Sequence, residues 1–177
     1  LACDHPQANR PRANRSRRRA ARGPVCPMAM ASILILVGTE SGNAQMVADA
    51  LKPVLASAGH AVNVSDAAAS AADFLGNDVL LVVCATHGAG DIPTNILPLA
   101  EALARDRPDL SGHRYGIIAL GDMTYQDTFC GGGKKLDDIF AACGAQRIGE
   151  RLEVDASEQP LPDEEALTWI EDWKALV

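Results

Sequence analysis

The chain has 177 residues, of which 47% are hydrophobic and 22% are charged. This length suits one domain with a substantial core, and no apolar run approaches the ~18 residues that a membrane helix needs. The formal net charge of −7 disfavours binding to nucleic acid or anionic membranes and favours basic partners.

The first 29 residues differ in composition from the rest. They carry seven arginines and one acid, Asp4, so the remainder keeps 9 of the 16 basic and 22 of the 23 acidic residues, a charge of −13. Without apolar periodicity, residues 1–29 are expected to be disordered and to lie outside a domain of residues 30–177. Because the stretch from Met28 resembles a natural beginning, we interpret residues 1–27 as vector or translated upstream sequence; a transit peptide and a nucleic-acid-binding arm are the alternatives.

The first half of the domain alternates strand and helix patterns. The apolar run 32–37 predicts a strand buried on both faces, and a second, short strand is predicted at 61–64. Between them a helix is predicted at 43–57, with Pro53 as a kink and Gly59 as its stop. Its inner face is expected to hold Met46, Val47, Ala50, Leu51, Val54 and Leu55. An alanine-rich connection with weak helical character follows.

The second half continues the alternation. Strands are predicted at 79–84, 115–120 and 147–154, the last nearer an edge, and helices at 96–105 and 134–143. Gly144 should end the second of these helices, and Pro162 suits the first turn of a final helix. The apolar stripe of that final helix is Leu167, Ile170, Trp173 and Leu176. Five strands alternating with helices predict an α/β fold, a doubly wound parallel sheet with helices on both faces.

Three loops at the carboxyl ends of the predicted strands, 38–44, 85–95 and 121–131, are the most glycine-rich and polar segments of the domain. In doubly wound sheets ligands bind outside the carboxyl ends of the strands, near the point where the strand order reverses. We therefore expect a ligand site where these loops meet.

The first loop lies within LILVGTESGNAQMVAD. Gly38 and Gly42 allow a tight turn, and Thr39, Ser41 and Asn43 carry side-chain donors. With the backbone amides and dipole of the following helix, these groups can hold a phosphate dianion without a cation. The nucleotide-hydrolase pattern fails because its lysine is missing, and the dinucleotide fingerprint fails on glycine spacing. An ordinary turn is the alternative.

The second and third loops suit a flat ligand. Gly88 and Gly90 permit positive φ and a close approach of the backbone to a ring. In the third loop Tyr125 offers a stacking surface beside Asp122, whereas Phe129 is expected to point into the core. The two loops together predict a slot for an aromatic ring system.

Metal and thiol chemistry find less support. His87 has no second histidine at ligand spacing. Cys84, Cys130 and Cys143 show neither CxxC pairing nor a secretion signal, which favours reduced thiols in the cytoplasm. Acidic neighbours should raise the pKa of Cys130, so we interpret it as a structural residue whose backbone N–H matters more than its sulfur.

Three segments in this order resemble the flavodoxins: GTESGNA, ATHGAGDIPTN and GDMTYQDTFCGGGKKLDD. The forms THGAGDIPxN and DTFCG look most like the short MioC-type flavodoxins, and the resemblance spans residues 31–176. It implies a flavodoxin-like fold, in which a five-stranded parallel sheet of order 2-1-3-4-5 is the middle of three α/β/α layers. It also implies one non-covalently bound FMN.

The resemblance implies the FMN contacts by position. Around the phosphate, with side chains or backbone amides, stand Thr39, Glu40, Ser41, Gly42, Asn43 and Ala44. Around the flavin ring stand Thr86, His87, Gly88, Ala89, Gly90, Leu120, Gly121, Asp122, Tyr125, Phe129, Cys130 and Asp155.

Several of these positions have specific roles in the family. Tyr125 matches the tyrosine on the outer flavin face, and Gly88 matches the residue whose carbonyl accepts the N5–H of the reduced flavin. The pyrimidine edge is contacted by residues matching Asp122, Phe129 and Cys130. The sequence departs from the common pattern at two positions: His87 replaces a tryptophan on the inner face, and Ala44 replaces a threonine. One extra residue lies between Tyr125 and Phe129.

The family implies a low-potential electron carrier rather than an enzyme. Its partners would be an NADPH-dependent flavodoxin/ferredoxin reductase and electron-acceptor enzymes with basic docking faces; biotin formation is one use associated with MioC-type relatives. We expect a cytoplasmic monomer that binds neither nucleic acid nor membrane. The acids expected to ring the exposed flavin edge are Glu40, Asp91, Asp122, Asp127, Asp137 and Asp138.

Three other functions are the alternatives to an electron carrier. An FMN-dependent NAD(P)H:quinone reductase shares the fold but would need an additional segment to build a substrate pocket. A phospho-receiver module needs paired acids, a further aspartate and a lysine at strand ends, where this sequence has Thr39–Glu40, Cys84 and Val154. The FMN module of a diflavin reductase would be joined to a reductase domain.

Overall fold

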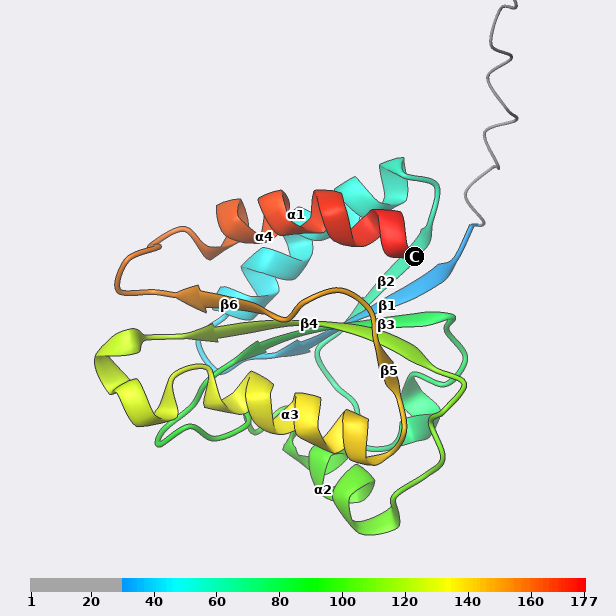
Figure 1. Ribbon diagram of the computed structural model, residues 1–177, viewed down its shortest axis with the longest axis horizontal. Coiled ribbons are helices and arrows are strands. Elements are labelled where there is room, and N and C mark those ends of the chain that lie inside the picture. Colours follow the sequence, from blue (N-terminus) through cyan, green and yellow to red (C-terminus); the bar gives the residue numbers. More distant parts are fainter. Residues whose placement is uncertain (1–29) are drawn as a thin grey trace, which may run out of the picture.

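The computed structural model describes residues 30–177; the predictions for residues 1–29 lie outside this range. Its centre is a parallel sheet of six strands in the order β2-β1-β3-β4-β5, with β6 also paired to β4 (Figure 1). The strands are β1 Ser32–Gly38, β2 Ala61–Ser65, β3 Val79–Ala85, β4 Arg114–Gly121, β5 Gln146–Arg147 and β6 Leu152–Asp155.

Two helices cover each face of the sheet. On one face lie α1 Asn43–Ser57 and α4 Pro162–Trp173, and on the other lie α2 Leu97–Asp106 and α3 Gly131–Ala142 (Figure 1). Alternate residues of β1 and β3 enter different cores: Ile33 and Leu81 pack under α1 and α4, whereas Leu34 and Leu80 pack under α2 and α3. This confirms the predicted three-layer, doubly wound fold, and full burial of both faces explains the continuous apolar runs of these strands.

The prediction of one strand over 147–154 is wrong. The segment splits into β5, which pairs with the start of β4, and β6, which pairs with its end. Gly149 separates them with φ +73°, a left-handed conformation that glycine adopts without strain. The backbone carbonyls freed at the break are used by α4: Trp173 Nε1 donates to Ile148 O (2.9 Å) and Trp169 Nε1 to Glu150 O (3.1 Å). The fifth position of the predicted order is thus shared by two short strands.

The predicted bounds of α1 are confirmed, but its inner face differs. Val47, Leu51 and Leu55 are buried as expected, whereas Met46 is 44% exposed. The alanines Ala44 and Ala48 take the remaining buried positions, since small side chains let the helix lie close to the sheet. Pro53 lies within the helix at an exposed position.

The other helices shift in start or content. α3 begins at Gly131, three residues before its predicted start, and Gly144 follows its end with φ +86° as expected. In α4 Ile170 and Trp173 are buried, but Leu176 follows the helix in a 3₁₀ turn and is 52% exposed. The alanine-rich connection forms only a 3₁₀ turn, Ala71–Asp73. Among residues 30–177 no helix combines the length and apolarity needed to cross a bilayer.

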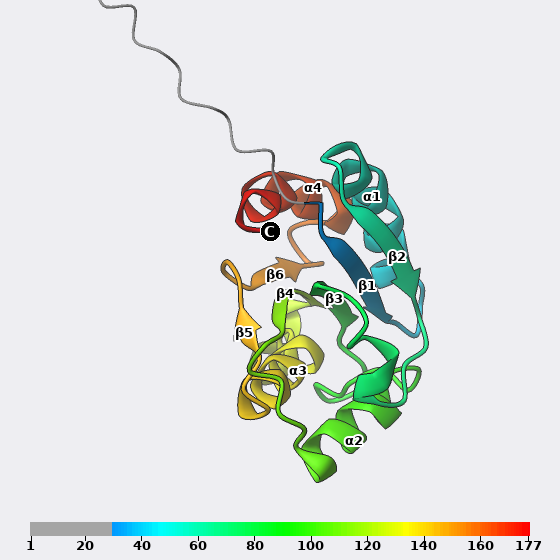
Figure 2. The same ribbon diagram turned by 90° about the vertical axis from the view of Figure 1, so that its right-hand side faces the viewer.

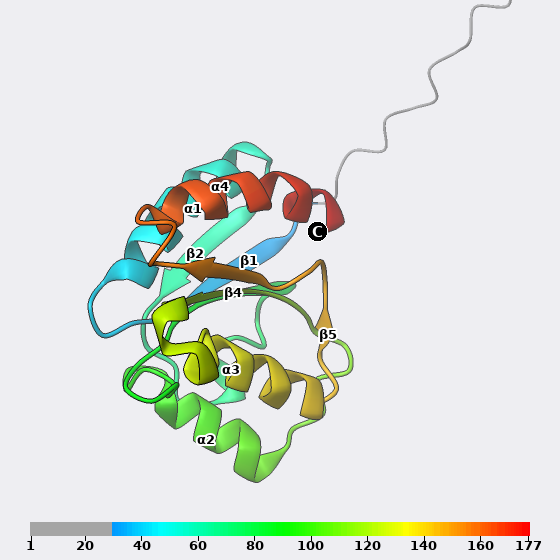
Figure 3. The ribbon, with the colours of Figure 1, turned by 60° about the vertical axis from the view of Figure 1, so that its left-hand side comes forward.

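The carboxyl ends of the central strands meet at one edge of the molecule. There the segments that follow β1, β3, β4 and β6 lie together, on the left of Figure 1 and nearer the viewer in Figure 3. The opposite edge, which faces the viewer in Figure 2, carries the amino ends of the strands and the end of the chain. The fold therefore brings all three polar loops to one edge.

Candidate functional site

A cleft of about 340 Å³ opens at the carboxyl edge, within the range of small-molecule sites. Eight residues predicted from the sequence line it: Ser41, Asn43, Thr86, Gly88, Leu120, Gly121, Asp122 and Tyr125. Three further residues line it that the sequence did not single out: Ala85, Thr128 and Ala156. All three loops, together with the segment after β6, therefore contribute to one site.

The first loop ends in an open helix N-terminus. Gly42 precedes α1 with φ +89°, and no side chain caps the helix there. The Gly42 amide donates to Thr39 Oγ1 (2.8 Å), which leaves the hydroxyl hydrogen of Thr39 free to donate elsewhere. Ser41 and Asn43 are exposed and line the cleft, whereas Ala44 is fully buried and does not line it. The loop thus presents neutral donors and the positive end of a helix dipole.

The carboxylate of Glu40 in the first loop is bound by the second loop. Glu40 Oε1 accepts from both the amide and the hydroxyl of Thr94, each at 2.7 Å. These two hydrogen bonds lower the pKa of Glu40 below its usual value, and the bond from the Thr94 amide has the larger effect. The acid of the first loop is therefore held as an anion by the second loop.

The second loop closes on itself. His87 and Asp91 exchange two backbone hydrogen bonds, of 2.9 and 2.7 Å, around Gly88, Ala89 and Gly90. Gly88 has φ +51° and Gly90 has φ +88°, as the sequence predicted. A side chain at Gly90 would lie 3.1 Å from Thr128 Cβ, so this glycine also lets the second and third loops touch.

His87 lies beside the cleft but does not line it, and its side chain is exposed. Ala89 is likewise exposed and contributes to the turn rather than to the cleft wall. Within residues 30–177 no group of three histidine, cysteine or acidic side chains could hold a metal ion. Asp91 pairs with Lys135 (2.9 Å), which lowers the pKa of Asp91 mainly through this hydrogen bond.

The third loop is shaped by two carboxylates. Asp122 accepts from the Thr124 amide (2.8 Å) at the start of the 3₁₀ segment Met123–Thr128. Asp155, which follows β6, accepts from the Met123 amide (2.9 Å), and this bond is the main cause of its lowered pKa. Asp155 therefore positions the loop without lining the cleft. Tyr125 lies at the cleft wall and is 68% exposed.

Cys130 is fully buried and takes φ +55° directly before α3. A side chain at Gly121 would lie 2.5 Å from the Cys130 amide, so Gly121 permits this close backbone contact. Burial, and secondarily the charge of Glu153, raises the pKa of the Cys130 thiol to about 12. The direction agrees with the sequence prediction, but burial is the principal cause.

Phe129 was expected in the core, and this is wrong. Its side chain is only partly buried and belongs to neither hydrophobic cluster. Lys134 Nζ lies 5.0 Å from the centre of its ring and donates to its carbonyl (2.9 Å). The cationic side chain at the start of α3 thus covers this ring.

Asp137 was expected among the acids at the cleft edge, and this is also wrong. It is 4% exposed and binds Tyr115 Oη (2.6 Å), Arg151 (2.5 Å) and Arg147. The neighbouring Asp138 lines a different groove, beside β5. Neither aspartate therefore belongs to the edge of the cleft.

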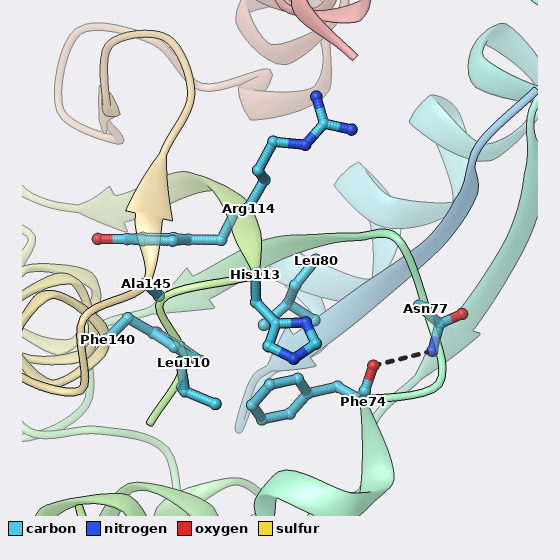
Figure 4. A pocket seen from close by; sticks show the side chains of 9 residues that line it. Phe74, Asn77, Leu80, Leu110, His113, Arg114, Phe140 and Ala145 are labelled. Carbon is cyan, nitrogen blue, oxygen red and sulfur yellow. Dashed lines mark hydrogen bonds between the residues drawn. The ribbon is translucent and has the colours of Figure 1, made fainter. Parts of the chain in front are cut away.

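Another hollow lies at the amino ends of β3 and β4. Figure 4 shows Phe74, Leu110, His113 and Phe140 converging on it. Its volume is about 10 Å³, room for roughly one water molecule. The carboxyl-edge cleft is thus the better candidate for a ligand site.

Comparison with known proteins agrees with this geometry. The family model described as Flavodoxin matches residues 35–169. Flavodoxin YqcA of Escherichia coli (strain K12) is 40% identical over 150 residues, covering 84% of this chain and 99% of the relative. Protein MioC of the same strain is 37% identical over 154 residues, with coverage of 84% and 99%. A flavodoxin from Pseudomonas aeruginosa, solved as a cysteine-to-alanine variant, has a TM-score of 0.74 at 32% identity, covering 82% of this chain and 97% of that one.

Proposed function

This chain belongs to the flavodoxin family, and we propose that it binds one FMN non-covalently at the carboxyl-edge cleft and carries single electrons between proteins. The observation that carries the proposal is the joining of a cation-free phosphate loop to an open slot built by two further strand-end loops. FMN supplies the redox chemistry, while the protein binds it, orients it and sets its electrostatic surroundings.

The first loop fits the phosphate of FMN. Thr39, Ser41 and Asn43 offer neutral side-chain donors, and the uncapped first turn of α1 offers backbone amides aligned with the helix dipole. Such a set stabilises a dianion. Because Glu40 is already bonded to Thr94, its charge is directed to the second loop rather than left unpaired at the phosphate site.

The second and third loops fit the flavin ring. Gly88 and Gly121 bring backbone to the cleft wall, and Tyr125 supplies an aromatic face for stacking. Thr86 Oγ1 donates to Leu120 O (2.9 Å), which ties the ends of β3 and β4 at the base of the slot. The backbone around Phe129 and Cys130 is proposed to contact the pyrimidine edge of the ring.

The exposed cleft suits transfer to another protein. Glu40, Asp91, Asp122 and Asp127 belong to the loops around it and would favour partners with basic docking faces. We propose an NADPH-dependent flavodoxin/ferredoxin reductase as the electron donor and cytoplasmic acceptor enzymes, biotin-forming enzymes among the candidates, as recipients. We also propose that residues 30–177 form an FMN-binding domain that acts as a monomer.

Titration of flavin-free protein with FMN, followed by quenching of flavin fluorescence, tests the cofactor. We expect saturation at one FMN per chain and much weaker binding of riboflavin, which lacks the phosphate. Absence of FMN binding would refute the proposal.

Stopped-flow mixing tests the carrier role. We expect slow reduction of the FMN-loaded protein by NADPH alone and fast reduction when a flavodoxin reductase is added, with a rate that falls as salt rises. Fast direct reduction by NADPH would instead favour a quinone reductase, and a rate independent of salt would refute electrostatic docking.

A further inference from the structure

We infer that Asn95 is a positioning residue that holds the phosphate loop in the shape that selects a phosphorylated flavin. Asn95 belongs to the second loop and does not line the cleft. The inference rests on the proposed function, because it concerns how the same site distinguishes FMN from riboflavin. It is carried by three hydrogen bonds of one half-buried side chain.

The amide of Asn95 joins three segments of the chain. Its Oδ1 accepts from the backbone amide of Thr39 (3.0 Å), the first residue after β1. Its Nδ2 donates to Val37 O (2.8 Å) within β1 and to Asp66 O (2.7 Å) directly after β2. One side chain from the loop after β3 therefore fixes the exits of β1 and β2.

These bonds require an amide. Both hydrogens of Nδ2 and the oxygen are used, so the group is at once a double donor and an acceptor. An aspartate at position 95 has the same shape but would place an oxygen opposite the carbonyls of Val37 and Asp66 and add a charge beside the loop. A leucine has a similar size and would leave all three backbone groups without this partner.

The contact at Thr39 continues into the phosphate loop. Thr39 Oγ1 in turn accepts from the amide of Gly42, the residue that precedes α1. The neighbouring residue Thr94 makes similar contacts with Glu40. Its backbone amide and its hydroxyl each donate a hydrogen bond of 2.7 Å to Glu40 Oε1. Two consecutive residues of the second loop thus hold two consecutive residues of the first, so the loop has its binding shape before a ligand arrives.

This arrangement predicts a selective effect. Loosening the first loop lowers the affinity for a ligand that carries a phosphate, because the donors are no longer preorganised around it. Riboflavin has the same ring and ribityl chain but no phosphate, and Asn95 does not line the cleft, so riboflavin affinity does not depend on a phosphate contact that Asn95 supports. The ratio of FMN affinity to riboflavin affinity is therefore the quantity that Asn95 controls.

Asn95→Asp and Asn95→Leu test the inference by fluorescence titration with FMN and with riboflavin. We expect FMN binding to weaken about 10- to 100-fold, and riboflavin binding to stay within about twofold. The matched control is Asn77→Leu: Asn77 is also half-buried and donates to a backbone carbonyl (Phe74 O, 3.2 Å), but it lies at the amino edge of the sheet (Figure 4). It should leave both affinities unchanged.

The outcomes separate the two proposals. Wild-type protein that binds neither flavin refutes the proposed function itself. If the wild type prefers FMN and the Asn95 variants keep that preference, or lose affinity for both flavins equally, the role of Asn95 is refuted. The proposed function is then unaffected. Should the variants fail to fold, hydrogen exchange of the flavin-free wild type decides: the Thr39 amide must exchange more slowly than that of exposed Ser41, and equal exchange would overturn the inference.

Discussion

Replacing Asp137 with asparagine should destabilise the fold and leave the proposed docking to a reductase intact. Asp137 is 4% exposed and binds Tyr115 Oη (2.6 Å), Arg151 (2.5 Å) and Arg147. Asparagine preserves the shape and an acceptor for the tyrosine. It removes the negative charge and turns an NH₂ group toward a guanidinium, so the pairing with the arginines is lost.

The expected loss of stability depends on how exposed the arginine partners of Asp137 are. Breaking a buried ion pair costs ~3–5 kcal/mol when the remaining charge stays buried. Here the side chains of Arg147 and Arg151 are 36% and 24% exposed, so they can regain water on the loss of Asp137. We therefore expect the free energy of unfolding to fall by about 1–3 kcal/mol, and the melting temperature by roughly 2–4 °C for each kcal/mol.

Urea unfolding of flavin-free protein, followed by the fluorescence of Trp169 and Trp173, measures this change. Asp138→Asn is the control, because Asp138 is the next residue of α3 and is exposed; its unfolding midpoint should match that of the wild type. Equal stability of the two variants would refute the buried-pair reasoning. A selective loss of reductase docking in Asp137→Asn would show that this acid faces the cleft edge after all.

Three further outcomes are expected. Gly88→Val should shift the one-electron potentials in spectro-electrochemistry, since φ +51° strains a β-branched residue at the cleft wall; unchanged potentials would contradict this. Gly116→Ala should lower the melting temperature, because the added Cβ would lie 2.4 Å from the indole of buried Trp173 in α4. An unchanged melting temperature would show that α4 can shift to make room for it. Cys84 and Cys130, each with a thiol pKa raised to about 12 by burial, should resist a thiolate-specific reagent at pH 8 until the protein is unfolded, and rapid labelling of the native protein would refute their burial.

Local patterns were sufficient to predict much of the fold. The apolar runs of β1 and β3 identify strands buried on both faces, and the bounds of α1 follow from its periodicity and from Gly59, which has φ +99°. Gly88 and Gly90 were identified as positions that permit positive φ, and both take it. These features depend on a few neighbouring residues, so the sequence contains the information directly.

The start of α3 shows where local patterns fail. Three consecutive glycines, with weak helix propensity, were interpreted as loop. In the structure they begin the helix because close packing requires them: side chains at Gly132 and Gly133 would lie 2.6 Å from Ala85 O and 2.4 Å from Ala119 Cβ. Packing against β3 and β4 thus overrides propensity. Asp137 was misplaced for a related reason, since its partners in β5 and after it are distant along the chain.

The break between β5 and β6 could not be predicted for the same reason. The segment alternates like one strand, and only the indole groups of Trp169 and Trp173, more than fifteen residues later, provide donors for the carbonyls at the break. In the candidate site the position of each loop was predictable from strand ends and glycines. The contacts between loops, such as Asn95 with Thr39, were not.

These contacts between loops resolve an apparent conflict in an acidic molecule that is proposed to hold a dianion. Glu40 accepts from Thr94, and Asp155 accepts from Met123, so each carboxylate satisfies a backbone amide of another loop. Those amides lower the pKa of both acids, so both remain ionised at neutral pH. A carboxylate with a lowered pKa contributes stability that is lost only as the pH falls through that pKa. The hydrogen bonds of Glu40 and Asp155 therefore persist at any pH at which the phosphate of FMN would be doubly charged. The acids near the site thus hold its loops together, while their charge stays available for the proposed docking to basic partners.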